Sequence, residues 1–219
     1  MLLFILAGYA RSGEPPTSTA EPQTTATTIA LSPTTSSSEG PVVAELIATG
    51  EGLPPGLYTR SNFEPAVRLE LDGSWEAVQI EDGFFDVQKL AGTPDVIAVQ
   101  FASVIGVVGV ADVVEPGNAA EAVEILRANE TVSVIETSSS RVGGLEGSQA
   151  TVENRTDDHA LVLQVRPGLL GIDPGRRLWI AFFDTDQGLL SVMVGGSTAH
   201  WDAALTEAEP VLESVVIGT

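Results

Sequence analysis

The segment Arg177–Ile217, RLWIAFFDTDQGLLSVMVGGSTAHWDAALTEAEPVLESVVI, contains the plainest fold signal in the chain. Residues 177–183 are apolar on both faces, which is typical of a strand covered on each side. The turn DTDQG leads into a second apolar run, 189–194. After a glycine pair we expect a helix with Ser197 or Thr198 as its N-cap. The segment therefore predicts two buried strands, the first of them central, and a C-terminal helix.

The apolar residues of this helix recur at spacings of four, three, four and three, which places them on one helical face: Trp201, Leu205, Ala208, Leu212 and Val215. Pro210 is expected to kink the helix. Trp179 of the preceding strand, together with Trp201 and Leu205, forms the candidate lining of an apolar ligand pocket between sheet and helix. Packing in the core is the alternative role of the tryptophans.

Short apolar runs separated by turn residues fill the earlier part of the chain. Residues 67–71 alternate between apolar and charged side chains, and two Asp-Gly turns follow, so we expect an antiparallel meander that reaches Leu90. The runs 95–101 and 104–110 predict two further strands. Leu169–Gly175 is expected to be a loop.

A helix is expected in the middle of the chain. Asn118 can cap its first turn, and Glu121 three residues later completes a pair that resembles a capping box. Further strands are expected on both sides of the turn-rich stretch SSSRVGGLEG. The predicted class is α+β, a mostly antiparallel sheet with this helix and the C-terminal helix packed on it.

Composition and charge limit the function. The chain has 219 residues, of which 43% are hydrophobic, and a formal net charge of −20. Residues 1–41 hold Arg11 against Glu14, Glu21 and Glu39, a net charge of −2, so −18 lies on the rest. An acidic surface repels phosphate backbones and anionic lipids, which disfavours nucleic acid and electrostatic membrane binding. With no cysteine, disulfides and zinc–thiolate sites are excluded.

The domain organisation follows from three changes in composition. Residues 1–10, MLLFILAGYA, are too short to span a bilayer and resemble the end of a signal peptide, whose start we expect to lie further upstream. Residues 11–53 are rich in Ser, Thr and Pro, which predicts a disordered linker. Residues 54–219 are expected to form a single domain, with no integral membrane span.

The first residues also resemble the start of a bacterial lipobox at Leu6-Ala7-Gly8, but Tyr9 stands where the lipid-bearing cysteine would be. We therefore expect a secreted or cell-envelope protein that is lipoprotein-like without being a true lipoprotein. A disordered apolar N-terminus of a cytoplasmic protein is the alternative.

Three segments carry a resemblance to a known group: GLYTRSNFEPAVRLEL (56–71), RVGGLEGSQATVENR (141–155) and SVMVGGSTAHWDAALTEAEPVLESVVI (191–217). They resemble uncharacterised secreted or lipid-anchored proteins of actinobacterial type, whose architecture is similar to the PsbP and LpqN-like α+β sandwich. This resemblance implies a binding or accessory factor. It transfers no catalytic residue.

The sharpest enzymatic signal is GGSTA at 195–199, which approximates the G-x-S-x-G turn of serine hydrolases. Only His200 follows the serine, and the other possible order is His159, Asp184 and Ser197. Helix capping by Ser197 is the competing role.

Other chemical motifs are incomplete. Asp184, Asp186 and Gly188 resemble the start of a calcium loop, but the spacing is one residue short and no closing glutamate follows. The glycines around 143–147 do not form a phosphate-binding pattern. Asn129 and Asn154 begin glycosylation sequons. We expect no metal and no cofactor.

Three functions remain open. The leading hypothesis is a non-enzymatic, exported binding or accessory module whose partner is an unknown protein or a small apolar ligand. The second is a serine-dependent hydrolase that uses Ser197. The third is a structural or sensory ectodomain.

Overall fold

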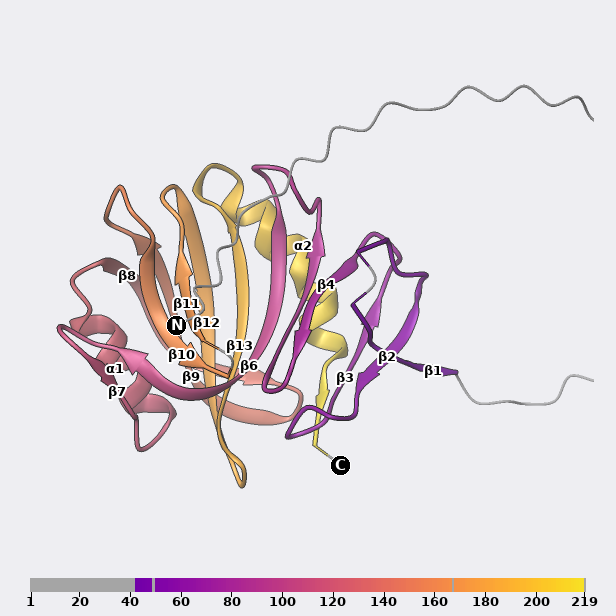
Figure 1. Ribbon diagram of the computed structural model, residues 1–219, viewed down its shortest axis with the longest axis horizontal. Helices are drawn as coiled ribbons and strands as arrows, with labels where there is room; N and C mark the ends of the chain where they lie inside the picture. The colour runs from indigo at the N-terminus through magenta and orange to yellow at the C-terminus, as the bar shows by residue number, and fades with distance from the viewer. Residues whose placement is uncertain (1–41, 49, 167, 219) are drawn as a thin grey trace, which may run out of the picture.

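The computed structural model describes residues 42–48, 50–166 and 168–218, which form two β-sheets and two α-helices (Figure 1). The predicted signal-like segment and most of the predicted linker lie outside the described residues. Within the described ranges, no helix has the length and apolarity required to cross a membrane. The predominance of antiparallel strands, with one helix in the middle of the chain and one near its end, agrees with the predicted α+β class.

The large sheet has the strand order β11-β10-β6-β13-β12-β9-β8, with β5 and β7 also paired to β6 and β4 paired to β5. Its strands have these bounds: β4 (Glu76–Glu81), β5 (Phe84–Lys89), β6 (Ile97–Val108), β7 (Val113–Val114), β8 (Val132–Val142), β9 (Leu145–Asn154), β10 (Ala160–Val165), β11 (Leu169–Ile172), β12 (Arg176–Thr185) and β13 (Gly188–Ser197). β12 lies inside the sheet between β13 and β9, which confirms the predicted central strand at 177–183, and β13 lies beside it.

Two predictions about these strands are wrong. The runs 95–101 and 104–110 belong mostly to one strand, β6, which pairs with β5 along its first half and with β10 along its second half. The predicted loop Leu169–Gly175 begins with a strand, β11, which pairs with β10. The first prediction fails because Ala102 and Ser103 stay extended between the two apolar runs, and the second because Gly171 lies within a strand without ending it.

The small sheet has the order β1-β2-β3-β14, formed by Val43–Glu45, Gly56–Arg60, Val67–Leu71 and Val216–Ile217. The expected meander is therefore only partly correct. The second Asp-Gly turn joins the antiparallel pair β4 and β5, but the first, Asp72-Gly73, connects the small sheet to the large one. β1 lies inside the stretch predicted to be a linker, and Leu46 and Leu53 are buried there.

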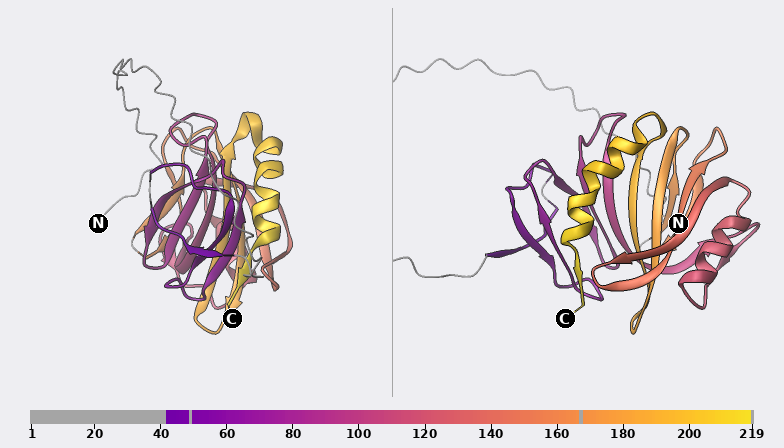
Figure 2. Two further views of the ribbon diagram at one scale, coloured as in Figure 1. Left: turned by 90° about the vertical axis from the view of Figure 1, so that its right-hand side faces the viewer. Right: turned by 180° about the vertical axis from the view of Figure 1, so that it is seen from behind.

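The two helices, α1 (Ala119–Ala128) and α2 (Trp201–Ser214), pack on opposite faces of the large sheet. α2 lies beside β13, β6 and β3, between the two sheets (Figure 2). It shares a hydrophobic core with residues such as Phe85, Phe101 and Phe183, whereas α1 shares the second core with Ile180 and Phe182. Alternate residues of one strand thus serve different cores, as the pleat requires.

Each helix begins near the residue predicted for it. Asn118 caps α1 by accepting a hydrogen bond from the Glu121 amide at 2.9 Å. Ser197 caps a short 3-10 helix, η1 (Thr198–His200), which leads into α2. Pro210 lies within α2. The buried face of α2 differs from the predicted stripe, because Ala204 and Val211 are buried while Leu205 and Leu212 are only partly buried.

β8 and β9 form a long hairpin around Gly143-Gly144. Gly143 has a φ of +60°, a left-handed conformation that glycine adopts readily. Gly147 on β9 has a different role, because a Cβ atom there would overlap the carbonyl oxygen of Phe182 on β12. The glycines of this stretch therefore allow a tight turn and a close approach of strands.

Candidate functional site

A cavity of about 860 Å³, here called the large cavity, lies on the face of the large sheet that carries α1. α1 contacts β6, β8, β9 and β12, and it leaves β4, β5 and the start of β6 uncovered by a helix. The cavity occupies this part of the face, and it is bordered by residues 91–94 and 170–176.

Its floor is polar. Three of the five buried polar residues in the described chain line it: Asp86, Gln88 and Gln100. Strand pairing explains why they lie together. Asp86 stands opposite Gln100 and Gln88 stands opposite Ala98, so all three side chains project from one face, while Phe85 and Val87 project from the other. We call Asp86, Gln88 and Gln100 the polar floor.

Asp86 is the one ionisable side chain that is fully buried among the described residues, with 2% of its surface exposed. Its carboxylate accepts a hydrogen bond from the Gln79 amide at 2.7 Å and another from Gln88 Nε2 at 2.6 Å. Burial raises the pKa of Asp86 to about 6, against the opposing hydrogen bonds from Gln88, Gln79 and Gln100, and the nearby Glu76 carboxylate raises it further.

Among the described residues, the charged side chain that shifts the pKa of Asp86 is not a cation but Glu76, which carries the same sign and also lines the large cavity. The Arg176 guanidinium lines the cavity too, but the carboxylates that act on its pKa are Asp173 and Asp95. Burial is the main influence on Arg176 and lowers its pKa.

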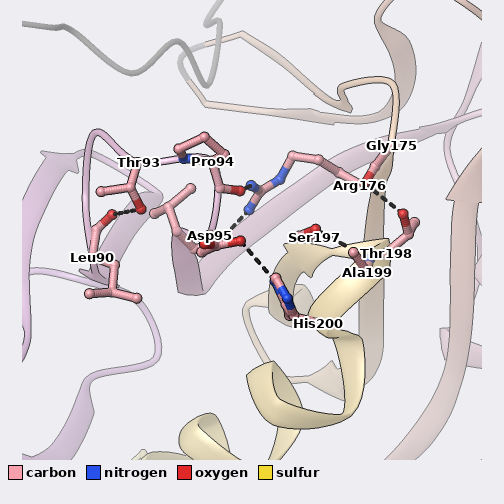
Figure 3. Close-up of polar contacts among 11 residues, drawn as sticks. Leu90, Thr93, Pro94, Asp95, Gly175, Arg176, Ser197, Thr198, Ala199 and His200 are labelled. Atoms are coloured by element: carbon pink, nitrogen blue, oxygen red, sulfur yellow. Dashed lines mark hydrogen bonds and ion pairs between the residues drawn. The ribbon is translucent and has the colours of Figure 1, made fainter.

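Arg176 holds one border of the cavity in place (Figure 3). It donates to the carbonyl oxygens of Val96 at 2.7 Å and Pro94 at 3.4 Å, which ties β12 to the segment 90–96, here called the rim loop. Asp95 of the same loop bonds His200 Nδ1 at 2.9 Å. The rim loop is thus anchored both to β12 and to the start of α2.

Ser197, His200 and Asp95 also line a smaller cavity of about 270 Å³ on the other side of the rim loop. His200 bonds Asp95, but the Ser197 hydroxyl accepts a hydrogen bond from the Ala199 amide at 3.3 Å, which is its capping role. Both side chains of the His200–Asp95 pair are more than half exposed.

The other predicted triad order, His159, Asp184 and Ser197, is not assembled. His159 Nδ1 bonds Asp173 Oδ1 at 2.8 Å, and Asp184 accepts the first helical amide of α1, that of Ala119, at 2.9 Å. Ser197 stands opposite Arg176 at one end of β12, eight residues from Asp184. At about 3.3 Å per residue the two side chains are about 26 Å apart.

The predicted pocket residues Trp179, Trp201 and Leu205 line neither cavity. Trp201 is buried, and the Arg177 guanidinium lies 5.6 Å from the centre of its ring. Trp179 and Leu205 are partly buried and pack against the core shared with α2. An apolar pocket at these three residues stays a prediction.

The two sequons have structural roles in which the asparagine amide is occupied. Asn129 Nδ2 donates to the carbonyl oxygens of Val108 and Leu161, at 3.1 and 2.9 Å. Asn154 Nδ2 donates to those of Asp158 and Ile172, both at 2.7 Å. Within the described residues, no group of three or more acidic, histidine or cysteine side chains is arranged to hold a metal ion.

Sequence reasoning placed Asp86 in a strand but assigned it no role. The available signal was its position in the apolar run Phe84-Phe85-Asp86-Val87, where strand alternation puts an acid beside buried aromatic residues. Gln100 could not be connected with it, because their proximity depends on the register of β5 and β6.

Solved structures similar to this chain include the cyanobacterial PsbP (CyanoP) of Synechocystis sp. PCC 6803, with 13% identity, a TM-score of 0.44 and coverage of 77% of this chain and 96% of that one. LpqN of Mycobacterium tuberculosis, described as involved in cell envelope biogenesis, has 10% identity, a TM-score of 0.39 and coverage of 82% and 90%. A protein of Bacteroides thetaiotaomicron VPI-5482 has 8% identity, a TM-score of 0.38 and coverage of 70% and 45%.

PsbP and LpqN, the two proteins named in the sequence resemblance, are therefore both among the structural neighbours. No protein-family model and no curated protein matches the chain. The nature of any ligand has to come from this chain's own residues.

Proposed function

We propose that the protein is a non-enzymatic, exported binding module that holds a small molecule in the large cavity. The observation that carries the proposal is the polar floor, because three buried polar side chains gather there beside a cavity, whereas the core under α1 is built from apolar side chains. A concave site with a few convergent polar groups is the usual form of a small-molecule site. The signal-like start and the Ser/Thr/Pro-rich stretch support export of a tethered domain.

This proposal replaces the small apolar ligand of the sequence hypothesis with a ligand that has a polar group. The cavity also has apolar lining from Val78, Phe84, Val96 and Leu170, so the ligand combines a polar group with an apolar body. Such a ligand would satisfy the floor and bury its own apolar surface.

Nuclear magnetic resonance tests the proposal. Fragments of varied polarity would be added to the full chain, and the side-chain amide signals of Gln88 and Gln100 would be followed. We expect the bound fragments to shift these signals. Binding that maps only to surfaces remote from the large cavity would contradict the proposed site. Export is tested separately by fractionation, and chains with Met1 intact in the cytosolic fraction would contradict it.

The hydrolase alternative has one observation in its favour, the hydrogen bond between His200 and Asp95 beside Ser197. Hydrolysis would require the Ser197 hydroxyl to leave its capping bond and reach His200. Ester hydrolysis by the wild-type chain, lost on Ser197→Ala with unchanged folding, would favour the enzyme over the binding module.

A further inference from the structure

We propose that the large cavity is selective for a positively charged ligand, such as a protonated primary amine, which binds over the polar floor beside Asp86 and Glu76. This inference rests on the proposed function and specifies its ligand class. The geometry that carries it is a carboxylate with 2% exposure, in a cavity that two further carboxylates line. These are Glu76 and Asp173, of which Asp173 bonds His159. The cationic side chain of the lining, Arg176, is directed to backbone oxygens.

The hydrogen-bonding roles in the floor favour a donor. A carboxylate only accepts hydrogen bonds, so Gln88 and Gln100 direct their amide nitrogens toward Asp86. Their amide oxygens are therefore left as acceptors that Asp86 does not use. Together with Glu76 they suit an N–H donor and disfavour a carboxylate or phosphate.

Electrostatics favour a charged donor over a neutral one. Removing a carboxylate from water without a counter-charge is unfavourable, and Glu76 adds repulsion. A cation bound between Asp86 and Glu76 would offset both effects in a site where water screens poorly. A hydroxyl group could donate hydrogen bonds but would leave the charges unbalanced.

A divalent metal ion fits this site less well than an amine. Calcium takes six to eight oxygen ligands, usually with several carboxylates. The described residues contain no group of three or more acidic, histidine or cysteine side chains that could hold a metal. An ammonium group needs about three acceptors, which the floor and Glu76 can supply.

Three probes of equal size test the inference: benzylamine, benzyl alcohol and benzoate, each titrated into the full chain while the Gln88 and Gln100 side-chain signals are followed. We expect benzylamine to bind at least about tenfold more tightly than benzyl alcohol, because a charge-assisted hydrogen bond contributes more than a neutral one. Benzoate should bind most weakly. Calcium chloride should not displace benzylamine.

Asp86→Asn and Glu76→Gln should each reduce the preference for benzylamine over benzyl alcohol, and the double variant should abolish it. Asp157→Asn, which removes an exposed carboxylate in a turn, is the control and should keep the preference. Equal or tighter binding of the alcohol or of benzoate in the cavity, a preference that survives the double variant, or displacement by calcium would overturn the inference and leave the proposed function standing. If none of the three probes shifts the floor signals, both are overturned.

Discussion

Replacing Asp86 by asparagine should stabilise the folded protein at neutral pH. Burial raises the pKa of Asp86 from its ordinary value of 3.8 to about 6. At about 1.4 kcal/mol per pH unit, this difference destabilises the fold by about 3 kcal/mol once the carboxyl is ionised in both the folded and the unfolded chain. Asparagine has nearly the same shape, carries no charge and can still accept the Gln79 amide bond through its oxygen. Its Nδ2 then faces Gln88, whose side-chain amide has to rotate by about 180° so that its oxygen accepts in place of the lost donation.

The pH dependence has a definite sign. Because the pKa is higher in the folded state, the folded chain holds the proton more tightly than the unfolded chain. The resulting stabilisation is fully present below about pH 3.8 and is lost as the pH rises through about 6. The unfolding free energy of Asp86→Asn minus that of the wild type should therefore increase by about 1.4 kcal/mol between about pH 5 and about pH 8.

Urea denaturation of both proteins at several pH values measures this difference, and taking the difference cancels the contributions of the other carboxylates. Asp157→Asn is the matched control, because Asp157 is exposed and its replacement should leave the difference constant with pH. If the unfolding free energy of Asp86→Asn minus that of the wild type stays constant or decreases as the pH rises, then burial of the Asp86 carboxyl does not raise its pKa, and the reasoning is refuted.

Three further changes test other parts of the structure. Arg176→Gln removes the bonds to the Pro94 and Val96 carbonyls, so amide hydrogen exchange in the rim loop should accelerate about tenfold or more. The control Arg68→Gln replaces an exposed arginine of β3 and should leave exchange in the rim loop unchanged. Gly147→Ala should lower the unfolding free energy by about 3 kcal/mol, measured in urea, because its methyl group would overlap the Phe182 carbonyl, while Gly52→Ala, with open space around it, should cost less than about 1 kcal/mol. Asn129→Ala should lower the unfolding free energy by about 2 to 4 kcal/mol, because it removes the side chain's bonds to the Val108 and Leu161 carbonyls and to the Thr131 amide. The control Asn118→Ala, which removes one helix cap, should lower it by about 1 kcal/mol. Equal losses in the two variants would contradict a bridging role of Asn129.

The sequence predicted elements whose signal is local. Asn118 and Ser197 cap helices because short polar side chains satisfy free amides in the first turn, and this requires no knowledge of the rest of the fold. The run at 177–183, which is apolar on both faces, is also a local signal, and it correctly predicts a central strand. The division into two sheets was not predictable in this way, because the pairing of β3 with β14 joins residues about 150 positions apart.

The candidate site depends on contacts between separate strands, which local sequence patterns do not reveal. Asp86 and Gln100 are ordinary residues in their own strands, and only the β5–β6 register brings them together. The prediction of a pocket at Trp179, Trp201 and Leu205 depends on the size and apolarity of these side chains. Large apolar side chains are also what a core requires, so this criterion does not distinguish a ligand site from packing.

The position of the two helices connects the polar floor to the fold. α1 covers the part of the sheet face where strands present Ile180, Phe182 and Ala150, and burial of these side chains stabilises the contact. No helix of the described chain covers the part where β5 and β6 present Asp86, Gln88 and Gln100. An apolar helix face packed there would have to cover the partly buried Glu76 as well, and it would bring no charge to compensate the two carboxylates. A small cation would bring that charge, so the composition of this part of the face suits the proposed ligand better than it suits a helix.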